Sequence, residues 1–257
     1  MSIDLAPPAY KLRLLGVVVD CVCWSALHNG DIGDAEDWAL LDSGERTRWI
    51  TFPHERERRR FLRSHAGLRR RLGAWLGVTP QSLRFETAAG GKPWLPAWPE
   101  IDFSLSHSAE WSALAFVRSS SVRVGNDIEA DRPLNDPLAL ARHALRHELN
   151  ALAALPPACR TRGVLRAWTG KEAVLKALGT GLAGPLDSFR LKLDTHGRPQ
   201  GLDWYPACEC LGDPLVTQRT ASLNVIRSGG FRDGIRVRGL PEPPGLAAWS
   251  VAAVQFK

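Results

Sequence analysis

The sequence has little of what a disulfide-stabilised, membrane-spanning or repetitive protein requires. Its five cysteines are odd in number, and both C-x-C pairs have one intervening residue, whereas zinc-binding pairs usually have two to four. We therefore expect reduced, mostly buried thiols. No apolar run approaches the roughly 20 residues of a membrane span, and no repeat or low-complexity segment occurs. These features favour a soluble, cytoplasmic protein that is not bound to a membrane.

The N-terminal stretch YKLRLLGVVVDCVCW has a superficial likeness to a signal peptide, because Lys11 and Arg13 precede an apolar run. Asp20 interrupts that run, and no clear small-residue cleavage site follows it. We interpret residues 11–24 as a buried strand.

A surplus of positive charge indicates the kind of partner. Lys and Arg number 33 against 27 Asp and Glu, so the formal net charge is +6. Such a protein attracts an anionic partner, which leaves nucleic acid, a phosphorylated cofactor or an acidic protein surface. The hydrophobic fraction of 44% and the length of 257 residues allow one large domain or two small ones with a sizeable core.

Periodicity predicts an α+β protein. Residues 54–76 carry apolar side chains at three- and four-residue steps and eight arginines on the other faces, which indicates an amphipathic helix. Further helices are predicted over 137–155, ending at Pro156-Pro157, and over 162–178, closed by glycine. Strands are predicted over 101–108, 111–119 and 121–130, and short strands and turns over the remainder. Long helices followed by strands occur once in each half, so we expect two similar halves, residues 1–121 and 122–257, to pack together.

The stretch VGNDIEA places two carboxylates two residues apart. Side chains alternate along a strand, so Asp127 and Glu129 would share one face, roughly 7 Å apart, and repel each other unless a cation lies between them. Mg²⁺ typically takes one or two protein carboxylates together with substrate phosphates. The spacing alone is also consistent with a solvated strand end that exposes both acids.

Three other stretches carry chemistry-bearing residues. Glu172 and Lys176 are four residues apart and share a helix face beside Lys171, as in an ordinary surface pair or as a metal ligand with a phosphate contact. Serines flank His107 in FSLSHS, where they could face an anion or form a hydrogen-bonded turn. In GGKPW, two glycines precede Lys92, whose position is constrained by the proline that follows it.

Together and in this order, the four stretches resemble the motifs of the Sfp-type 4′-phosphopantetheinyl transferases. The family pattern is G-K-P, (N/S)-L-S-H-S, (I/V)-G-x-D-(I/V)-E and W-x-x-K-E-A-x-x-K-x-x-G. This sequence has GKP at 91–93, SLSHS at 104–108, VGNDIE at 124–129 and WTGKEAVLKALG at 168–179. The resemblance covers residues 90–182, and the last seventy or so residues carry no matching motif.

The resemblance implies a fold of two α/β halves related by a pseudo-two-fold axis, and a set of site residues. The acids that match the Mg²⁺ ligands are Asp127, Glu129 and Glu172, of which Asp127 and Glu172, with Lys176, carry the catalysis. Lys176 matches the lysine at the pyrophosphate of coenzyme A, and His107 matches the histidine at its 3′-phosphate. Residues at nucleotide-contact positions are Ser106 and Lys92, and the candidate 3′-phosphate arginines are Arg46, Arg48 and Arg59.

Two departures from the family pattern concern the surroundings of the site. Asn126 stands where an apolar residue is common, and we expect it to tilt away from the metal without loss of activity. Glu110 and Trp111 replace small residues after the histidine, so they could alter the cofactor pocket or the carrier-facing surface.

The implied reaction moves the phosphopantetheine arm of coenzyme A, with Mg²⁺, onto a serine of an apo acyl or peptidyl carrier protein and releases adenosine 3′,5′-bisphosphate. Glu172 or a metal-bound hydroxide could serve as the base. Carriers are typically small and acidic, so a basic enzyme would attract them, with docking expected around residues 131–155. The length favours a monomer that serves polyketide, nonribosomal-peptide or fatty-acid carriers.

Two alternatives differ in class. The arginine-rich helix and the pI of about 9.4 would suit nucleic-acid binding. Against this, no helix-turn-helix, zinc-finger or RNP signature occurs, and acids interrupt the basic stretches. A degenerate family member that binds coenzyme A without transfer is disfavoured because Asp127, Glu129, Glu172 and Lys176 are all present.

Overall fold

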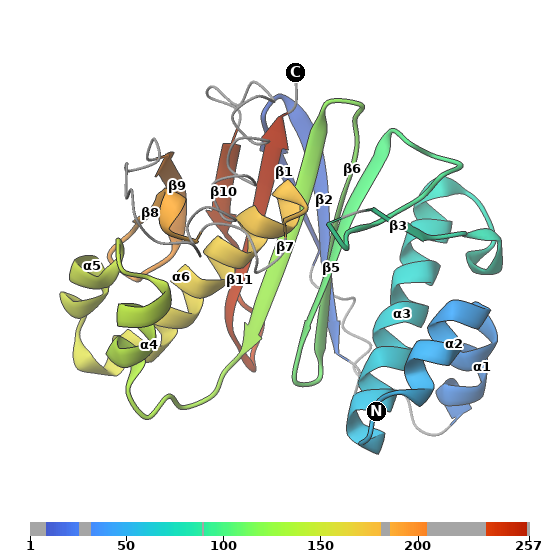
Figure 1. Cartoon of the computed structure of the whole chain (residues 1–257), viewed down its shortest axis with the longest axis horizontal. Helices are drawn as coiled ribbons and strands as arrows, with labels where there is room; N and C mark the ends of the chain where they lie inside the picture. The colour runs from blue at the N-terminus through green and yellow to red at the C-terminus, as the bar shows by residue number, and fades with distance from the viewer. Residues whose placement is uncertain (1–8, 26–31, 89, 181–185, 205–234, 256–257) are drawn as a thin grey trace, which may run out of the picture.

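The fold consists of two antiparallel sheets packed face to face, each covered on its outer face by a long helix. The computed structural model describes all residues except 1–8, 26–31, 89, 181–185, 205–234 and 256–257. Figure 1 shows the helices α3 and α6 on opposite sides of the molecule, with the sheets between them. The expected mixture of helix and sheet is confirmed.

The first sheet is formed by the N-terminal part of the chain. Its strand order is β1-β2-β6-β5, and its strands are β1 (Ala9–Leu14), β2 (Val17–Ser25), β5 (Ile101–Ser108) and β6 (Trp111–Arg118). Three helices lie outside it, namely α1 (Ile32–Leu40), α2 (Ser43–Ile50) and α3 (Glu55–Leu76). A short 3₁₀ turn (Pro80–Ser82) and a hairpin of β3 (Glu86–Thr87) and β4 (Pro93–Trp94) lead into β5.

The predicted helix over 54–76 is confirmed as α3. Leu68 and Leu72 from its apolar stripe pack against Phe103 and Leu114 of the sheet. The helix ends where Gly77 adopts a left-handed conformation with φ of 72°, which a glycine reaches at little steric cost.

The second sheet has the order β10-β11-β7. Its strands are β7 (Val122–Ala130), β10 (Ile235–Gly239) and β11 (Leu246–Gln255). Its helices are α4 (Pro137–Ala144), α5 (Leu149–Ala153) and α6 (Pro157–Leu178). A 3₁₀ turn (Leu186–Ser188) and a hairpin of β8 (Phe189–Leu193) and β9 (Pro199–Trp204) complete the described C-terminal region.

Two predicted helix boundaries are wrong. The segment 137–155 is two helices, because the chain turns at Leu145, which is buried, and brings the buried Glu148 to Lys171. The predicted helix at 162–178 begins earlier, at Pro157. Proline is favoured at the first helical position, where its missing N–H costs no hydrogen bond, so Pro157 begins α6 shortly after α5 ends at Ala153.

The inner faces of the two sheets share one hydrophobic core. Cys21, Ala113 and Val117 from the first sheet meet Val124 and Trp249 from the second. Cys21 and Cys23 are buried free thiols, as expected, whereas Cys159 is exposed, and the other two cysteines lie outside the described residues. None of the described helices is long and apolar enough to cross a membrane.

Helix α6 lies unusually close to β7. A Cβ atom added to Gly125 would meet the carbonyl oxygen of Ala173 at 1.9 Å, so this position requires glycine. The close approach places the middle of α6 directly over the strand that carries Asp127 and Glu129, which brings all the predicted acids to one part of the molecule.

A buried arginine ties α3 to the segment before α2. The Arg69 side chain is fully buried and donates to Asp42 at 2.6 Å, to Glu45 at 2.8 Å and to the carbonyl of Leu83 at 2.9 Å. Burial by itself would raise the pKa of Glu45, but the bonds from His65 and Arg69 lower it to about 2. Because the folded-state pKa is depressed, the carboxylate stabilises the protein above its unfolded pKa, and this contribution is lost as the pH falls toward 2.

We predict that Glu45→Gln lowers the free energy of unfolding at pH 7 by about 2–3 kcal/mol. Urea titrations of both proteins at pH 7, 5, 4 and 3 measure the difference, which should shrink below pH 4.5. The control Glu86→Gln alters an exposed acid and should change stability little. A Glu45→Gln deficit that stays constant down to pH 3 would contradict the ion-pair explanation.

Candidate active site

The site lies at the seam where the edge strand β5 of one sheet meets the edge strand β7 of the other. The two strands are joined by side chains, because four β5 residues on one face accept hydrogen bonds from backbone N–H groups of β7. The four pairs are Asp102 with Val124 (2.6 Å), Ser104 with Asn126 (3.0 Å), Ser106 with Ile128 (3.3 Å) and Ser108 with Ala130 (3.0 Å). We call this set the seam ladder. It satisfies N–H groups that an edge strand would otherwise leave unpaired.

Asp127 and Glu129 share a side of β7, as the alternation predicts. Ser106 Oγ donates to Asp127 Oδ1 at 2.7 Å, and Ser108 Oγ donates to Glu129 Oε2 at 3.0 Å. Asp127 is buried and Glu129 is half-buried. The acids are therefore not a solvated strand end, since each is held by a serine of the opposite sheet.

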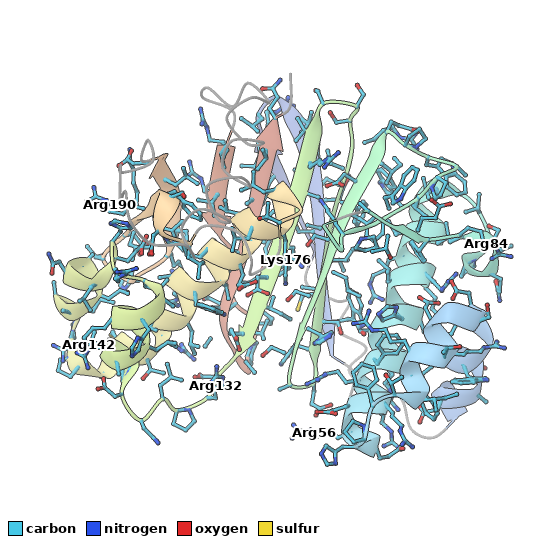
Figure 2. The ribbon with its side chains drawn as sticks, in the orientation of Figure 1. Arg56, Arg84, Arg132, Arg142, Lys176 and Arg190 are labelled. Atoms are coloured by element: carbon cyan, nitrogen blue, oxygen red, sulfur yellow. The ribbon has the colours of Figure 1, made fainter. Side chains whose placement is uncertain are left out.

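Lys176 reaches the same point from α6. Its Nζ lies 2.7 Å from Asp127 Oδ1, 3.2 Å from Ser106 Oγ and 3.2 Å from the carbonyl oxygen of Asn126. Figure 2 shows Lys176 in the middle of the molecule, where α6 crosses β7. The lysine is thus the nearest cation to the buried carboxylate of the strand.

Glu172 lies one helical turn before Lys176 and has an unusual environment. Burial and the negative charges of Asp127 and Glu129 together raise its pKa to about 7, although Lys176 opposes them. Its Oε1 atom is buried and has no hydrogen-bond partner among the described residues. A buried carboxylate oxygen without a partner is costly unless something binds it.

The three acids fit a hard cation by their chemistry. Carboxylate oxygens are the ligands that Mg²⁺ prefers. Asp127 and Glu129 lie close enough to Glu172 for their charges to raise its pKa, and among the described residues Glu172 Oε1 has no hydrogen-bond partner. Within the described residues, no group of three His, Cys, Asp or Glu side chains is already arranged to hold a metal. The described arrangement instead has Asp127 paired with Lys176.

His107 follows Ser106 at the end of β5 and lies in a cationic environment. Loss of water around its ring and repulsion by Arg60, Lys176 and His65 together lower its pKa to about 4. A neutral imidazole beside several cations is suited to receiving an anion, whose charge would favour the protonated ring.

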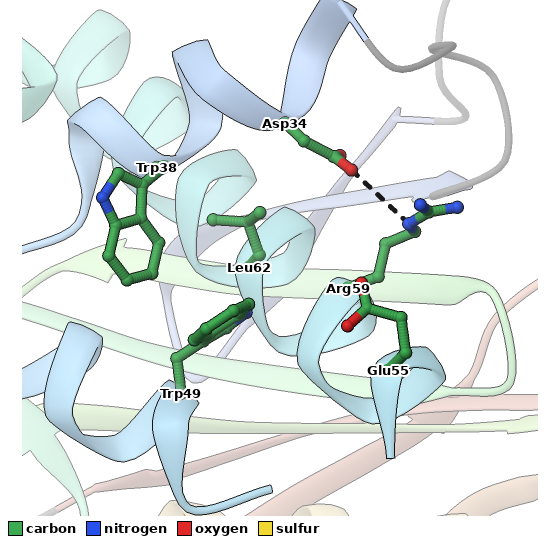
Figure 3. Close-up of a pocket in the computed structure, with 6 residues that line it drawn as sticks. All are labelled: Asp34, Trp38, Trp49, Glu55, Arg59 and Leu62. Carbon is green, nitrogen blue, oxygen red and sulfur yellow. Dashed lines mark ion pairs between the residues drawn. The ribbon is translucent and has the colours of Figure 1, made fainter. Parts of the chain in front are cut away.

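The three arginines predicted from the sequence lie in different places. Arg48 stacks over the Phe61 ring at 5.4 Å, and Arg46 stacks over Trp38 and donates to its carbonyl at 3.1 Å. Arg59 is turned toward Asp34, with its Nε 3.4 Å from the carboxylate (Figure 3).

The Arg59 side chain lines a cavity of about 370 Å³ among α1, α2 and α3. Its other lining residues are Asp34, Trp38, Trp49, Glu55 and Leu62. None of the acids of the seam and no part of His107 is among them, so this cavity is distinct from the seam.

The two predicted nucleotide contacts are engaged with the protein. Lys92 Nζ binds the Asp102 carboxylate and the carbonyl oxygen of Val124, the latter at 2.8 Å, and it thereby closes one end of the seam ladder. Ser106 is buried, and its hydroxyl contacts Asp127, Ile128 and Lys176.

The departures from the family pattern have structural explanations. Asn126 faces the core, where it accepts from Trp249 Nε1 at 2.7 Å and donates to the Ala113 carbonyl at 2.8 Å. It points away from the acids, as expected. Glu110 pairs with Arg56 at 3.1 Å and links the β5–β6 turn to α3, while Trp111 lies against the core shared by the sheets.

Two residues of the site, Asp102 and Arg60, were missed at the level of the sequence, and Ser108 was noted only as one of the serines that flank His107. Asp102 and Ser108 have the same two-residue spacing as Ser104 and Ser106, so the alternation of β5 was a usable signal. Arg60 carried no such signal, because it is one of several neighbouring arginines on α3.

The fold and the site describe an enzyme of two packed α/β parts, with acids, a lysine and a histidine beside several cations at the seam. Residues 123–217 match the model of the 4′-phosphopantetheinyl transferase superfamily. The chain is 36% identical to the 4′-phosphopantetheinyl transferase HetI of Nostoc sp. over 177 residues, which are 67% of this chain and 73% of that protein. It is 32% identical to the 4′-phosphopantetheinyl transferase Sfp of Bacillus subtilis over 170 residues, 62% of this chain and 74% of that protein.

The chain belongs to the 4′-phosphopantetheinyl transferase superfamily, and it is an enzyme of that class. The family suggested by the four sequence motifs is thereby confirmed.

We predict that Arg60→Gln raises the pKa of His107 from about 4 toward its ordinary value, because it removes a repelling charge. An NMR titration of the His107 ring measures the change. The neighbouring Arg59→Gln is the matched control and should leave that pKa unchanged, since Arg59 is directed to Asp34. Equal shifts in the two variants would show that His107 senses only the total charge of α3.

Proposed function

We propose that this enzyme transfers the phosphopantetheine arm of coenzyme A to a serine of an apo carrier protein and releases adenosine 3′,5′-bisphosphate. The observation that carries the proposal is the meeting of Asp127, Glu129 and Glu172 with Lys176 at one seam. Names of the relatives support phosphopantetheinyl transfer. The acids and Lys176 are suited to binding a diphosphate together with a metal ion, and the surroundings of His107 are suited to binding a further phosphate.

Asp127, Glu129 and Glu172 would hold Mg²⁺. A bound Mg²⁺ neutralises charge that develops on a leaving diphosphate. Lys176 stabilises the same charge from the protein side, since its Nζ is already placed beside Asp127. Glu172 is the residue of this chain that could serve as the base, because a carboxylate with a pKa of about 7 can accept a proton near neutral pH.

His107 would bind the 3′-phosphate, which positions coenzyme A without taking part in the chemistry. Its cationic neighbours support this role, and Arg60 joins the candidates Arg46, Arg48 and Arg59. Lys92 and Ser106 remain proposed near the nucleotide, where their contacts with the seam ladder favour a role in shaping the site.

Acidic carrier proteins, of polyketide, nonribosomal-peptide or fatty-acid synthases, are the proposed partners. Three exposed arginines lie in the predicted docking region 131–155, each in an ion pair with an acid of this chain, namely Arg132, Arg142 and Arg146. Figure 2 labels Arg132 and Arg142. These cations support docking by charge. We propose a cytoplasmic monomer that binds neither nucleic acid nor membranes.

We further propose that the halves 1–121 and 122–257 are related by a pseudo-two-fold axis. Both contain a 22-residue helix, α3 or α6, that packs on an antiparallel sheet and ends at a left-handed glycine with φ of 72° or 73°. Such repetition is what a duplicated α/β unit would produce.

Glu172→Gln and Asp127→Asn should each abolish transfer while the protein remains folded, because each removes a proposed metal ligand. The measurement is the mass of an apo-carrier after incubation with coenzyme A and Mg²⁺. Glu100→Gln, which alters an acid paired with Arg118 on the surface, is the control and should keep full activity. Wild-type rates in folded Glu172→Gln would remove the acids from the mechanism.

Lys176→Ala should lower kcat by about a hundredfold or more, because the loss of one preorganised charge at a developing anion typically costs 10²–10³ in rate. Steady-state kinetics with a fixed carrier measure it, and the KM for coenzyme A should change less. An unchanged kcat would mean that Lys176 serves only to neutralise Asp127.

A further inference from the structure

We propose that Ser106 and Ser108 are positioning residues that set the metal affinity of the site. Each donates its hydroxyl proton to one carboxylate while its oxygen accepts an N–H of the seam ladder, and the Ser106 oxygen also accepts from Lys176 at 3.2 Å. The inference rests on the proposed function, since it presumes that the acids bind Mg²⁺. It concerns residues that touch the proposed ligands and not the ion.

A serine hydroxyl group has a single proton to donate. Ser108 Oγ accepts the N–H of Ala130 at 3.0 Å, so that side of the oxygen is occupied and its own proton is directed elsewhere. That proton goes to Glu129 Oε2 at 3.0 Å. Ser106 repeats the arrangement, accepting from Ile128 at 3.3 Å and donating to Asp127 Oδ1 at 2.7 Å.

Each serine engages only one oxygen of its acid. Among the described residues, Asp127 Oδ2 and Glu129 Oε1 have no hydrogen bond. The hydroxyls therefore fix the rotation of each carboxylate and leave its second oxygen for a ligand. Because the N–H donors are backbone atoms of β7, the orientation is tied to the sheet and costs little further ordering when a cation binds.

Ser104 provides a contrast within the same ladder. It accepts the N–H of Asn126 at 3.0 Å, so it joins the strands as the other two serines do. Its own hydroxyl faces the Asn126 carbonyl at 3.5 Å and contacts no carboxylate. Loss of Ser104 should weaken the seam without disturbing an acid, which makes it a matched control.

The test compares the Mn²⁺ affinity of the wild type with that of Ser108→Ala, Ser106→Ala and Ser104→Ala. Mn²⁺ alone is the probe, and its binding is measured by isothermal titration or by the electron paramagnetic resonance of free Mn²⁺. Unfolding in urea reports the stability of each variant. We expect about tenfold weaker binding for Ser108→Ala and Ser106→Ala, the lower end of the effect typical of groups that orient metal ligands. Ser104→Ala should bind within about twofold of the wild type, although all three lose a similar amount of stability.

Two further measurements separate positioning from general damage. Ser108→Thr keeps the hydroxyl at a half-buried position and should restore the affinity. The transfer activity of Ser108→Ala should recover when Mg²⁺ is raised about tenfold, because only the affinity is altered.

The outcomes distinguish the two proposals. If the wild type binds no Mn²⁺, or binds it no more tightly than Asp127→Asn does, the proposed metal site is wrong, and so is this inference. If the wild type binds Mn²⁺ and Ser108→Ala binds it equally well, the positioning role alone is wrong. The same conclusion follows if Ser104→Ala loses as much Mn²⁺ affinity as Ser108→Ala.

Discussion

The rest of the structure depends on the four hydrogen bonds by which β5 side chains replace a strand partner for β7. An edge strand cannot leave its N–H groups unpaired in a packed interior, and here Asp102, Ser104, Ser106 and Ser108 satisfy them at two-residue intervals. Because side chains span the gap in place of backbone, the sheets meet at an edge and leave room for functional groups. The acids of β7 and the histidine of β5 are therefore brought together by the contact that joins the two parts.

Electrostatics at the seam follow from that placement. Asp127, Glu129 and Glu172 are crowded together with limited water, so the pKa values of both glutamates rise, while Lys176 offsets part of the negative charge. On the α3 side, loss of water around the ring and the repulsion of Arg60 lower the pKa of His107 to about 4. One end of the site thus needs a cation and the other needs an anion. The proposed substrate, a diphosphate with a metal ion and a further phosphate, would supply both.

Sequence patterns predicted the features that are local. Alternation placed Asp127 and Glu129 on one face, and the apolar stripe located α3 nearly to the residue. The failures are non-local. Pro157 was taken for a helix end, although Pro at a first position also begins helices. Which of the adjacent arginines lies near His107 depends on the rotation of α3 against β5. The seam ladder depends on which sheet edges meet. Neither feature can be predicted from the sequence of one segment. The motifs identified the candidate site residues, and the structure showed which side chains and backbone groups they contact.

A crystal structure of the enzyme with coenzyme A and Mn²⁺ tests the central claim most directly. The account predicts an anomalous peak for manganese between the diphosphate and the carboxylates of Asp127, Glu129 and Glu172, with all four rungs of the seam ladder intact and the 3′-phosphate at His107. Manganese elsewhere, or β5 separated from β7 while the diphosphate is bound, would contradict it.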